Sequence, residues 1–297
     1  ASGDIRTSTA DGSTPEISTA GNALLVAGGA IGNEGRRIEL SGVTTLATQS
    51  ADAQWLSHGG GNLAVGAAIL DNRGGAVRHS GKGTADIAAH ELQGAGGSIA
   101  SNGALAIVGD TTDLGGGSTF GEHIRIETGR LLNSGGRLIA SGTDLLRVRA
   151  RDGVVNTGGT IAGNGALDLH TASLGNQDGK ISAAGSADTR VEVDAVFDNR
   201  GGELVAGGSM HVKAGDLSNQ GGTVLSAERA ALTVDVANRL DNSAKGTLAA
   251  DDDLTVSASV LDNRGGVIQH AGDGSATVLA AQLQGAGGSI ASNGTLE

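Results

Sequence analysis

The sequence contains no cysteine and one proline, and aromatic residues make up 1% of its 297 residues. The absence of cysteine excludes a disulfide framework. So few aromatic residues are atypical of an ordinary globular core, whereas an apolar fraction of 38% is too high for a disordered chain. Slim aliphatic side chains stacked in a narrow core would explain both properties.

Positive charge is also scarce, because the formal net charge is −12. This charge argues against nucleic acid or an anionic membrane as the main partner. No apolar run reaches membrane-spanning length, and residues 1–4 lack the basic and apolar regions of a signal peptide.

A repeated phrase dominates what is present. Residues 70–75, Leu-Asp-Asn-Arg-Gly-Gly, return unchanged at 261–266, and looser copies recur between them about every 21 residues. Asn occupies its position in 8 of 11 copies, the Gly-Gly pair is complete in 8, and an apolar residue follows in 9. Such a period predicts a solenoid. The predicted coils start at Leu70, Leu92, Leu114, Leu131, Val154, Leu174, Phe197, Leu217, Leu240, Leu261 and Leu283.

Apolar and polar residues alternate within each coil, as in Val191-Glu192-Val193-Asp194. Alternation with period 2 is typical of strands with one buried face, and a glycine pair in every coil disfavours helices. The fold class predicted is therefore all-β, a right-handed parallel β-helix (β-solenoid) with coils of about 21 residues.

The template residues have distinct predicted roles. Leu, Val and Ile form files inside the coils, and the Asn side chains stack from coil to coil. Gly-Gly permits positive φ at the same corner. Arg73, Arg200 and Arg264 follow the Asn and are expected to point to solvent.

Two segments are distinguished by regularity. Residues 1–69 follow the template loosely and are predicted to form less regular coils, whereas residues 70–297 form the regular repeat, truncated within its last coil. The coil at 114–130 spans 17 residues and lacks both Asn and Gly-Gly in this alignment, so we expect an irregularity there. Residues 70–103 and 261–294 are near copies, which indicates an internal duplication.

Candidate sites are few, and no catalytic, cofactor-binding or metal-binding residue is predicted. The acidic run Asp251–Asp253 is expected to be a solvated turn, and Gly94–Gly97 a turn, since neither Lys-Ser/Thr nor a helix follows it. No metal-ligand spacing joins the seven histidines, which are His58, His79, His90, His123, His170, His211 and His270.

Arg147, Arg149 and Arg151 alternate along one strand and could meet an anionic sugar, although a solvated strand face is the simpler interpretation. A carbohydrate-active β-helix enzyme, a polysaccharide lyase or hydrolase, is the alternative function. Such an enzyme needs carboxylates or a basic residue gathered in one groove, whereas the acids here are spread over many coils.

The recurring Leu-Asp-Asn-Arg-Gly-Gly and Leu217-Ser-Asn-Gln-Gly-Gly-Thr-Val224 resemble the haemagglutinin repeat of filamentous haemagglutinins. This group includes two-partner-secreted exoproteins and contact-dependent growth-inhibition toxins. The likeness covers 70–297 closely and 1–69 loosely. The Asn-Pro signatures of the family's secretion domain and an Arg-Gly-Asp tripeptide are not found.

The resemblance implies the shaft of a filamentous adhesin, a monomeric fibre without cofactors or enzymatic activity. It further implies export through an outer-membrane two-partner-secretion transporter to the surface and surroundings of a Gram-negative bacterium. Attachment to host-cell glycans or receptors, and a role in virulence, would follow. The stalk of a growth-inhibition toxin is a second alternative.

Overall fold

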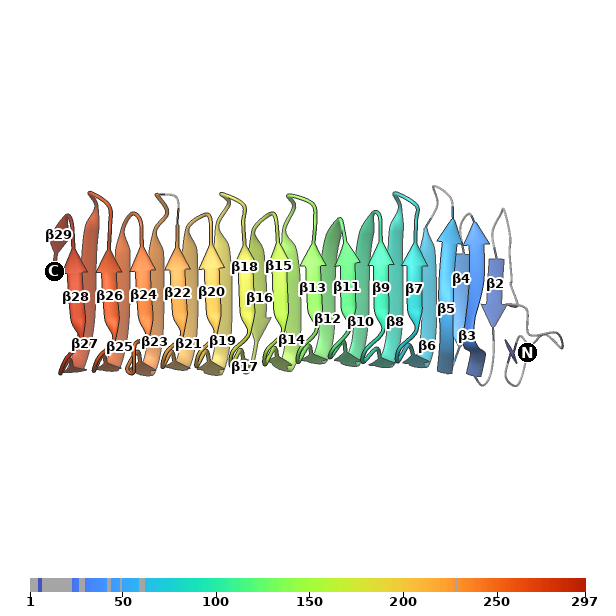
Figure 1. The fold of residues 1–297 in the computed structure, drawn as a ribbon, viewed down its shortest axis with the longest axis horizontal. Coiled ribbons are helices and arrows are strands. Elements are labelled where there is room, and N and C mark those ends of the chain that lie inside the picture. Colours follow the sequence, from blue (N-terminus) through green and yellow to red (C-terminus); the bar gives the residue numbers. More distant parts are fainter. Residues whose placement is uncertain are drawn as a thin grey trace. The chain divides into compact units, whose positions relative to one another are not determined.

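The computed structural model describes residues 5–6, 23–26, 30–41, 44–48, 50–58, 62–227 and 229–297. The chain divides into two compact units, Ala1–Gly142 and Thr143–Glu297. Each unit is built of coils that contribute one strand to sheet A and one to sheet B (Figure 1). The prediction of less regular coils in 1–69 falls largely outside the described residues, and the boundary after residue 69 stays a prediction.

In the first unit, each strand pairs with the strand two places further along the chain. Sheet A contains β1 (Ile5–Arg6), β3 (Ala30–Ser41), β5 (Ser50–His58), β7 (Ala76–His79), β9 (Ser98–Ser101), β11 (Ser118–Gly121) and β13 (Arg137–Ala140). Sheet B contains β2 (Ala23–Val26), β4 (Thr44–Thr48), β6 (Leu63–Asp71), β8 (Thr84–Gln93), β10 (Ala104–Asp113) and β12 (His123–Leu132).

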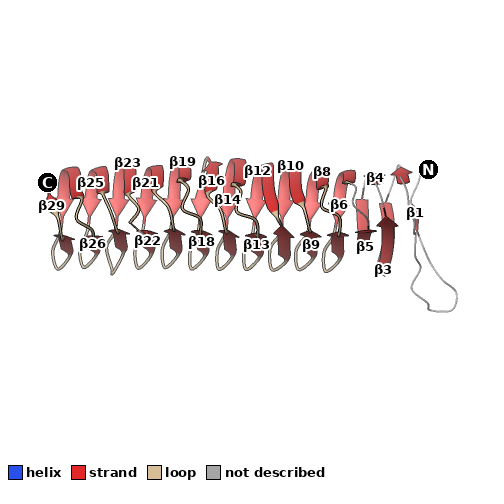
Figure 2. Ribbon diagram, turned by 90° about the horizontal axis from the view of Figure 1, so that it is seen from above, coloured by secondary structure: helices blue, strands red, loops and turns tan. Residues whose placement is uncertain are grey.

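The second unit repeats this arrangement (Figure 2). Its sheet A contains β15 (Thr160–Gly163), β18 (Lys180–Ala183), β20 (Glu203–Ala206), β22 (Thr223–Ser226), β24 (Thr247–Ala250), β26 (Val267–His270) and β28 (Ser289–Ser292). Its sheet B contains β14 (Leu146–Val155), β16 (Leu167–Thr171), β19 (Thr189–Asp198), β21 (Met210–Ser218), β23 (Leu232–Asp241), β25 (Leu254–Asp262), β27 (Ser275–Gln284) and β29 (Thr295–Leu296), with β17 (Leu174–Gly175) pairing β14 and β19.

Parallel pairing brings equivalent residues of successive coils into register. In the second unit Val148 pairs with Leu169, Leu169 with Val191, and Val191 with Val212, and these four side chains are fully buried. The described residues include no helix, and the parallel strands recur about 21 residues apart in a β-solenoid of about 11 turns. The predicted fold class is therefore confirmed, while the hand of the coil stays a prediction from the crossover preference.

The asparagines form a ladder at the corner that follows sheet B. In the second unit each Nδ2 donates to the Oδ1 of the next Asn at 2.7–2.8 Å, and all six side chains are buried. The ladder runs through Asn156, Asn176, Asn199, Asn219, Asn242 and Asn263. Each amide thus satisfies a polar group of the neighbouring coil inside the protein, which confirms the predicted stacking.

The two glycines of each pair have different functions. The first adopts the left-handed conformation, with φ of +63° at Gly221 and +64° at Gly265. The second lets neighbouring coils come close together, since a Cβ on Gly222 would lie only 2.1 Å from the carbonyl oxygen of Asn199. Backbone conformation therefore favours the first glycine, although Asp178 adopts φ of +52° at this position, and space requires the second.

The irregularity expected at 114–130 is not present, because the predicted coil start was two residues too late. Thr112, not Leu114, pairs with Leu92 and Leu131, and no register shift interrupts these strand pairs. Gly116, with φ of +61°, and Gly117 supply the glycine pair. Only the Asn is lost, and buried Leu114 takes its place. The apolar pattern places the coil start at Leu114 because the residue that occupies the inward position, Thr112, is polar.

We expect Asn199→Ala to lower the free energy of unfolding by about 2–4 kcal/mol. The change deletes donation to Asn219 Oδ1 and leaves Asn176 Nδ2 with only its longer hydrogen bonds to the Gly179 and Glu203 carbonyls. Asn238→Ala on the exposed face is the control, with an expected change within about 0.5 kcal/mol. Urea unfolding followed by circular dichroism measures both, and equal effects of the two substitutions would contradict a stabilising ladder.

Gly222→Ala is expected to destabilise the protein by about 2–3 kcal/mol, because the added methyl group overlaps a backbone carbonyl that cannot move aside. Gly285→Ala serves as its control, since a Cβ there meets nothing within 4 Å. Thermal unfolding of both variants provides the comparison. An unchanged melting temperature for Gly222→Ala would show that the coils are free to separate at this corner.

Candidate functional site

A row of carboxylates lies beside the asparagine ladder. Asp198, Asp241 and Asp262 each precede a ladder Asn, and Asp71 precedes Asn72 in the first unit. Each of these carboxylates accepts the backbone N–H two residues later. This is the local turn that Asp favours. In the sequence Asp-Asn-Arg-Gly-Gly, the Asp carboxylate thus fixes the backbone of the turn, and the Asn side chain bonds to the next coil.

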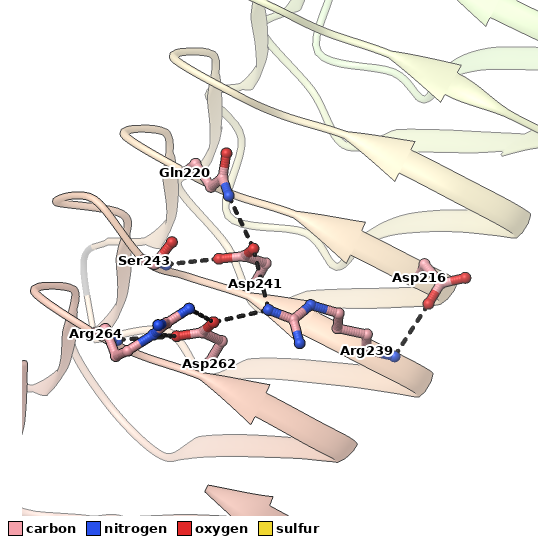
Figure 3. A network of polar contacts seen from close by, with 7 residues as sticks. All are labelled: Asp216, Gln220, Arg239, Asp241, Ser243, Asp262 and Arg264. Atoms are coloured by element: carbon pink, nitrogen blue, oxygen red, sulfur yellow. Dashed lines mark hydrogen bonds and ion pairs between the residues drawn. The ribbon is translucent and has the colours of Figure 1, made fainter. Parts of the chain in front are cut away.

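Arginine guanidinium groups neutralise these carboxylates. In the second unit Arg264 Nη2 and Arg239 Nη2 both lie 2.7 Å from Asp262 Oδ2, and Arg239 Nη2 also lies 3.4 Å from Asp241 (Figure 3). Gln220 of the preceding coil donates to Asp241 at 2.8 Å. Arg73, Arg200 and Arg264 are more than half exposed, as predicted.

The corner carboxylates are held in the ionised form. The hydrogen bond from Arg264 is the largest influence on Asp262 and, against the opposing effect of burial, lowers the pKa of its carboxyl to about 2. The pKa values of Asp71, Asp198, Asp241 and Asp253 are also lowered. At Asp198 burial alone would raise the pKa, but hydrogen bonds from Arg200 and Gln177 outweigh it. A general acid of a glycosidase requires the opposite shift.

A second polar cluster covers part of the outer face of sheet B in the second unit. Four cationic side chains lie on β14, β19 and β21, with two carboxylates between them. Strand register places Arg147 beside Asp168, Asp168 beside Arg190, and Glu192 beside Lys213. We call this cluster the cationic patch, defined by Arg147, Arg149, Arg190, Lys213, Asp168, Glu192, His170 and His211.

The cationic patch is only partly neutralised. Asp168 Oδ2 lies 3.3 Å from Arg147 Nε and 2.8 Å from Arg149 Nη2, and Arg190 pairs with Glu192 at 2.8 Å. Lys213 is exposed. The patch holds four cations and two carboxylates with both histidines neutral, and two further carboxylates border it: Asp235, in register with Lys213, and Asp194, 3.4 Å from His170. The patch is therefore a local concentration of cations in a chain of net charge −12.

Sequence reasoning found only part of this cluster. Arg147 and Arg149 lie in the patch, but Arg151 lies beyond the stretch where β14 pairs with β16, and it pairs with its neighbour Asp152 at 3.1 Å. Arg190 and Lys213 were missed because they are two and three coils further along. Adding the coil spacing to positions 147 and 149 would have found them, since the register leads to 190 and 213.

The histidines occupy two kinds of environment. His79 and His270, equivalent in the duplicated segments, are buried with Nδ1 facing Ser101 Oγ at 3.1 Å and Ser292 Oγ at 2.8 Å. His90 and His170 are at the surface, where Asp110 and Asp194 accompany them. Within the described part of the chain, no group of three His, Cys, Asp or Glu residues could hold a metal ion. The side chain of His58 lies outside the described residues.

The remaining candidates are turns. Asp251–Asp253 lies between β24 and β25, where Asp251 accepts the backbone N–H of Arg229 and Asp253 accepts two hydrogen bonds from Ser275. Gly94–Gly97 forms a corner closed by a hydrogen bond from the Gly97 N–H to the Gly94 carbonyl. Two shallow grooves on sheet B each contain one carboxylate, Asp110 or Asp235, rather than a pair.

Two parallel sheets whose strands recur one coil apart define a β-solenoid repeat protein. The model of the haemagglutinin repeat family matches residues 56–85, 80–158, 143–195, 186–244 and 229–297, and the chain belongs to this family. No curated protein and no solved structure matches the chain. The part of the chain that the structure describes contains no helix long and apolar enough to cross a membrane.

Family and fold together fit the shaft of a filamentous haemagglutinin-like protein. They indicate a structural, adhesin-type protein rather than an enzyme, and the family consists typically of secreted exoproteins. The resemblance inferred from the repeated Asn and Gly-Gly is thereby confirmed.

Acid is expected to remove the stabilisation that Asp262 provides. Its folded-state pKa is lowered, so the contribution is complete above about pH 4 and is lost as the pH falls toward 2. The shift corresponds to about 1–2 kcal/mol after allowance for the solvent-exposed guanidinium groups. Thermal melts of wild type and Asp262→Asn should therefore differ at pH 6 and converge near pH 2. Asp252→Asn is the control, and a difference that persists at pH 2 would contradict this origin.

Proposed function

We propose that this chain is a shaft segment of a secreted, surface-displayed filamentous adhesin whose cationic patch binds anionic glycans on host cells. The observation that carries the proposal is the cluster of Arg147, Arg149, Arg190 and Lys213 on three strands of one exposed sheet face. Guanidinium and ammonium groups are suited to sulfate and carboxylate ligands. Attachment through such a patch would contribute to virulence.

The fold supports display. The backbone hydrogen bonds of each inner coil are made with its two neighbours, so outer side chains are held at fixed positions one coil apart. Export through an outer-membrane two-partner-secretion transporter of a Gram-negative bacterium, as a monomeric fibre, is part of the proposal, and membership of the haemagglutinin repeat family supports secretion. The lowered carboxyl pKa values give no support to the alternative of glycan cleavage.

Binding to a sulfated polysaccharide and to epithelial cells tests the proposal, at two salt concentrations. We expect saturable binding that weakens with salt, since exposed charges are screened. Arg149→Ser with Lys213→Ser should weaken binding at least about tenfold, because hydrogen bonds to charged groups contribute about 1.5–3 kcal/mol each.

The matched control is Arg78→Ser with Arg137→Ser, which removes two exposed charges from sheet A of the first unit. It changes the net charge equally but leaves the cationic patch intact. Equal loss of binding in both double variants would indicate attraction to the whole chain rather than to the patch. No binding by the folded wild-type chain would reject the proposed adhesive role of this segment.

A further inference from the structure

Two histidines lie within the rows of the cationic patch. His170 on β16 pairs in register with Arg149 on one side and Glu192 on the other. His211 on β21 pairs in register with Arg190 and with Thr233. Both side chains lie on the outer face, at positions that alternate with buried residues. Two of the eight patch residues can therefore change charge near neutral pH.

Two charged side chains lie at the two ring nitrogens of His170. Its Nδ1 lies 3.5 Å from Arg149 Nη1, and its Nε2 lies 3.4 Å from Asp194 Oδ1. Arginine can only donate, so the position of Arg149 suits a ring whose Nδ1 carries no proton. A proton on Nδ1 would end the contact with Arg149 Nη1 and leave that nitrogen free for a ligand, while Nη2 stays 2.8 Å from Asp168.

Charged groups surround both imidazoles on neighbouring strands. Facing His170 are Arg149 from β14, Asp168 on its own strand, and Glu192 and Asp194 from β19. Near His211 are Arg190 and Glu192 from β19, Lys213 on its own strand and Asp235 from β23. Each imidazole therefore lies among side chains of both signs.

We infer that the cationic patch is a pH-dependent binding site, in which protonation of His170 and His211 strengthens the binding of anionic glycans. The inference rests on the proposed function and assigns two further binding residues to the same site. Protonation of both imidazoles raises the charge of the patch by two units, because each imidazole adds one. It also frees Arg149 Nη1 from His170. The patch thus holds a sulfated ligand more tightly in mildly acidic surroundings than at neutral pH.

Binding of the whole chain to a sulfated dextran oligosaccharide at pH 7.5 and pH 5.5, at one ionic strength, tests this inference. The sulfates of this probe stay ionised at both pH values, so only the protein changes charge. We expect about three- to tenfold tighter binding at pH 5.5. This range is the Coulomb attraction of two added positive charges for an anionic group roughly 7 Å away, with and without salt screening. The double variant His170→Gln with His211→Gln should lose most of this gain, measured as the ratio of its own affinities at the two pH values.

The control is His90→Gln, which removes a surface His–Asp pair from sheet B of the first unit and should keep the full gain. Wild-type binding that is equal at both pH values would overturn the pH dependence and leave the proposed function standing. A gain that persists in the double variant would overturn the assignment to these histidines. Absence of binding at both pH values would overturn the inference and the proposed function together.

Discussion

The close approach of successive coils at the asparagine corner is the constraint on which the rest of the structure depends. Asn199 donates its amide to Asn219 at 2.7 Å while its backbone carbonyl faces the next coil, 2.1 Å from where a Cβ on Gly222 would lie. Buried amides are stable only when their hydrogen bonds are made, and the missing Cβ lets the backbones come close enough. Together these features fix the position of one coil on the next. Strand register, core files and surface rows are consequences of that position.

Because the register is fixed, the period of the sequence determines which side chains are neighbours on the outer face. Residues separated by one coil become neighbours at the strand spacing of about 4.8 Å, so the outer face can be read row by row. The row that begins Arg147, Asp168, Arg190 and His211 continues as Thr233, Thr255 and Thr277. The charged stretch of this row therefore ends at β21. Alternating signs limit repulsion within the stretch, and its two arginines outnumber its one carboxylate, which favours anions.

Much of the fold follows from the sequence because the corner requires particular residue types. Asn recurs because its amide stacks, and the second glycine because a Cβ would overlap the neighbouring coil; the first glycine suits positive φ, which Asp178 also adopts. The register at Leu114 was not predictable from apolar periodicity, because Thr112 occupies the inward position and a leucine stands where Asn is expected. The turn at Asn242 gained a residue, with Ala244 and Lys245 at positive φ, which moved the inward position to Leu248. The candidate site required the register itself, since Arg190 and Lys213 have no local motif.

Protonation has different consequences at the corner carboxylates and at the histidines of the cationic patch. Asp262 is fully buried at the corner and ion-paired with Arg264 and Arg239, so its protonation changes the stability of the coil stack below about pH 4. His170 lies at the surface, 40% exposed, and its protonation changes charge without removing any contact of the core. Imidazole side chains change charge between about pH 5 and 8, well above the acid range of the corner. The patch can therefore respond to mild acid while the ladder that positions it stays intact.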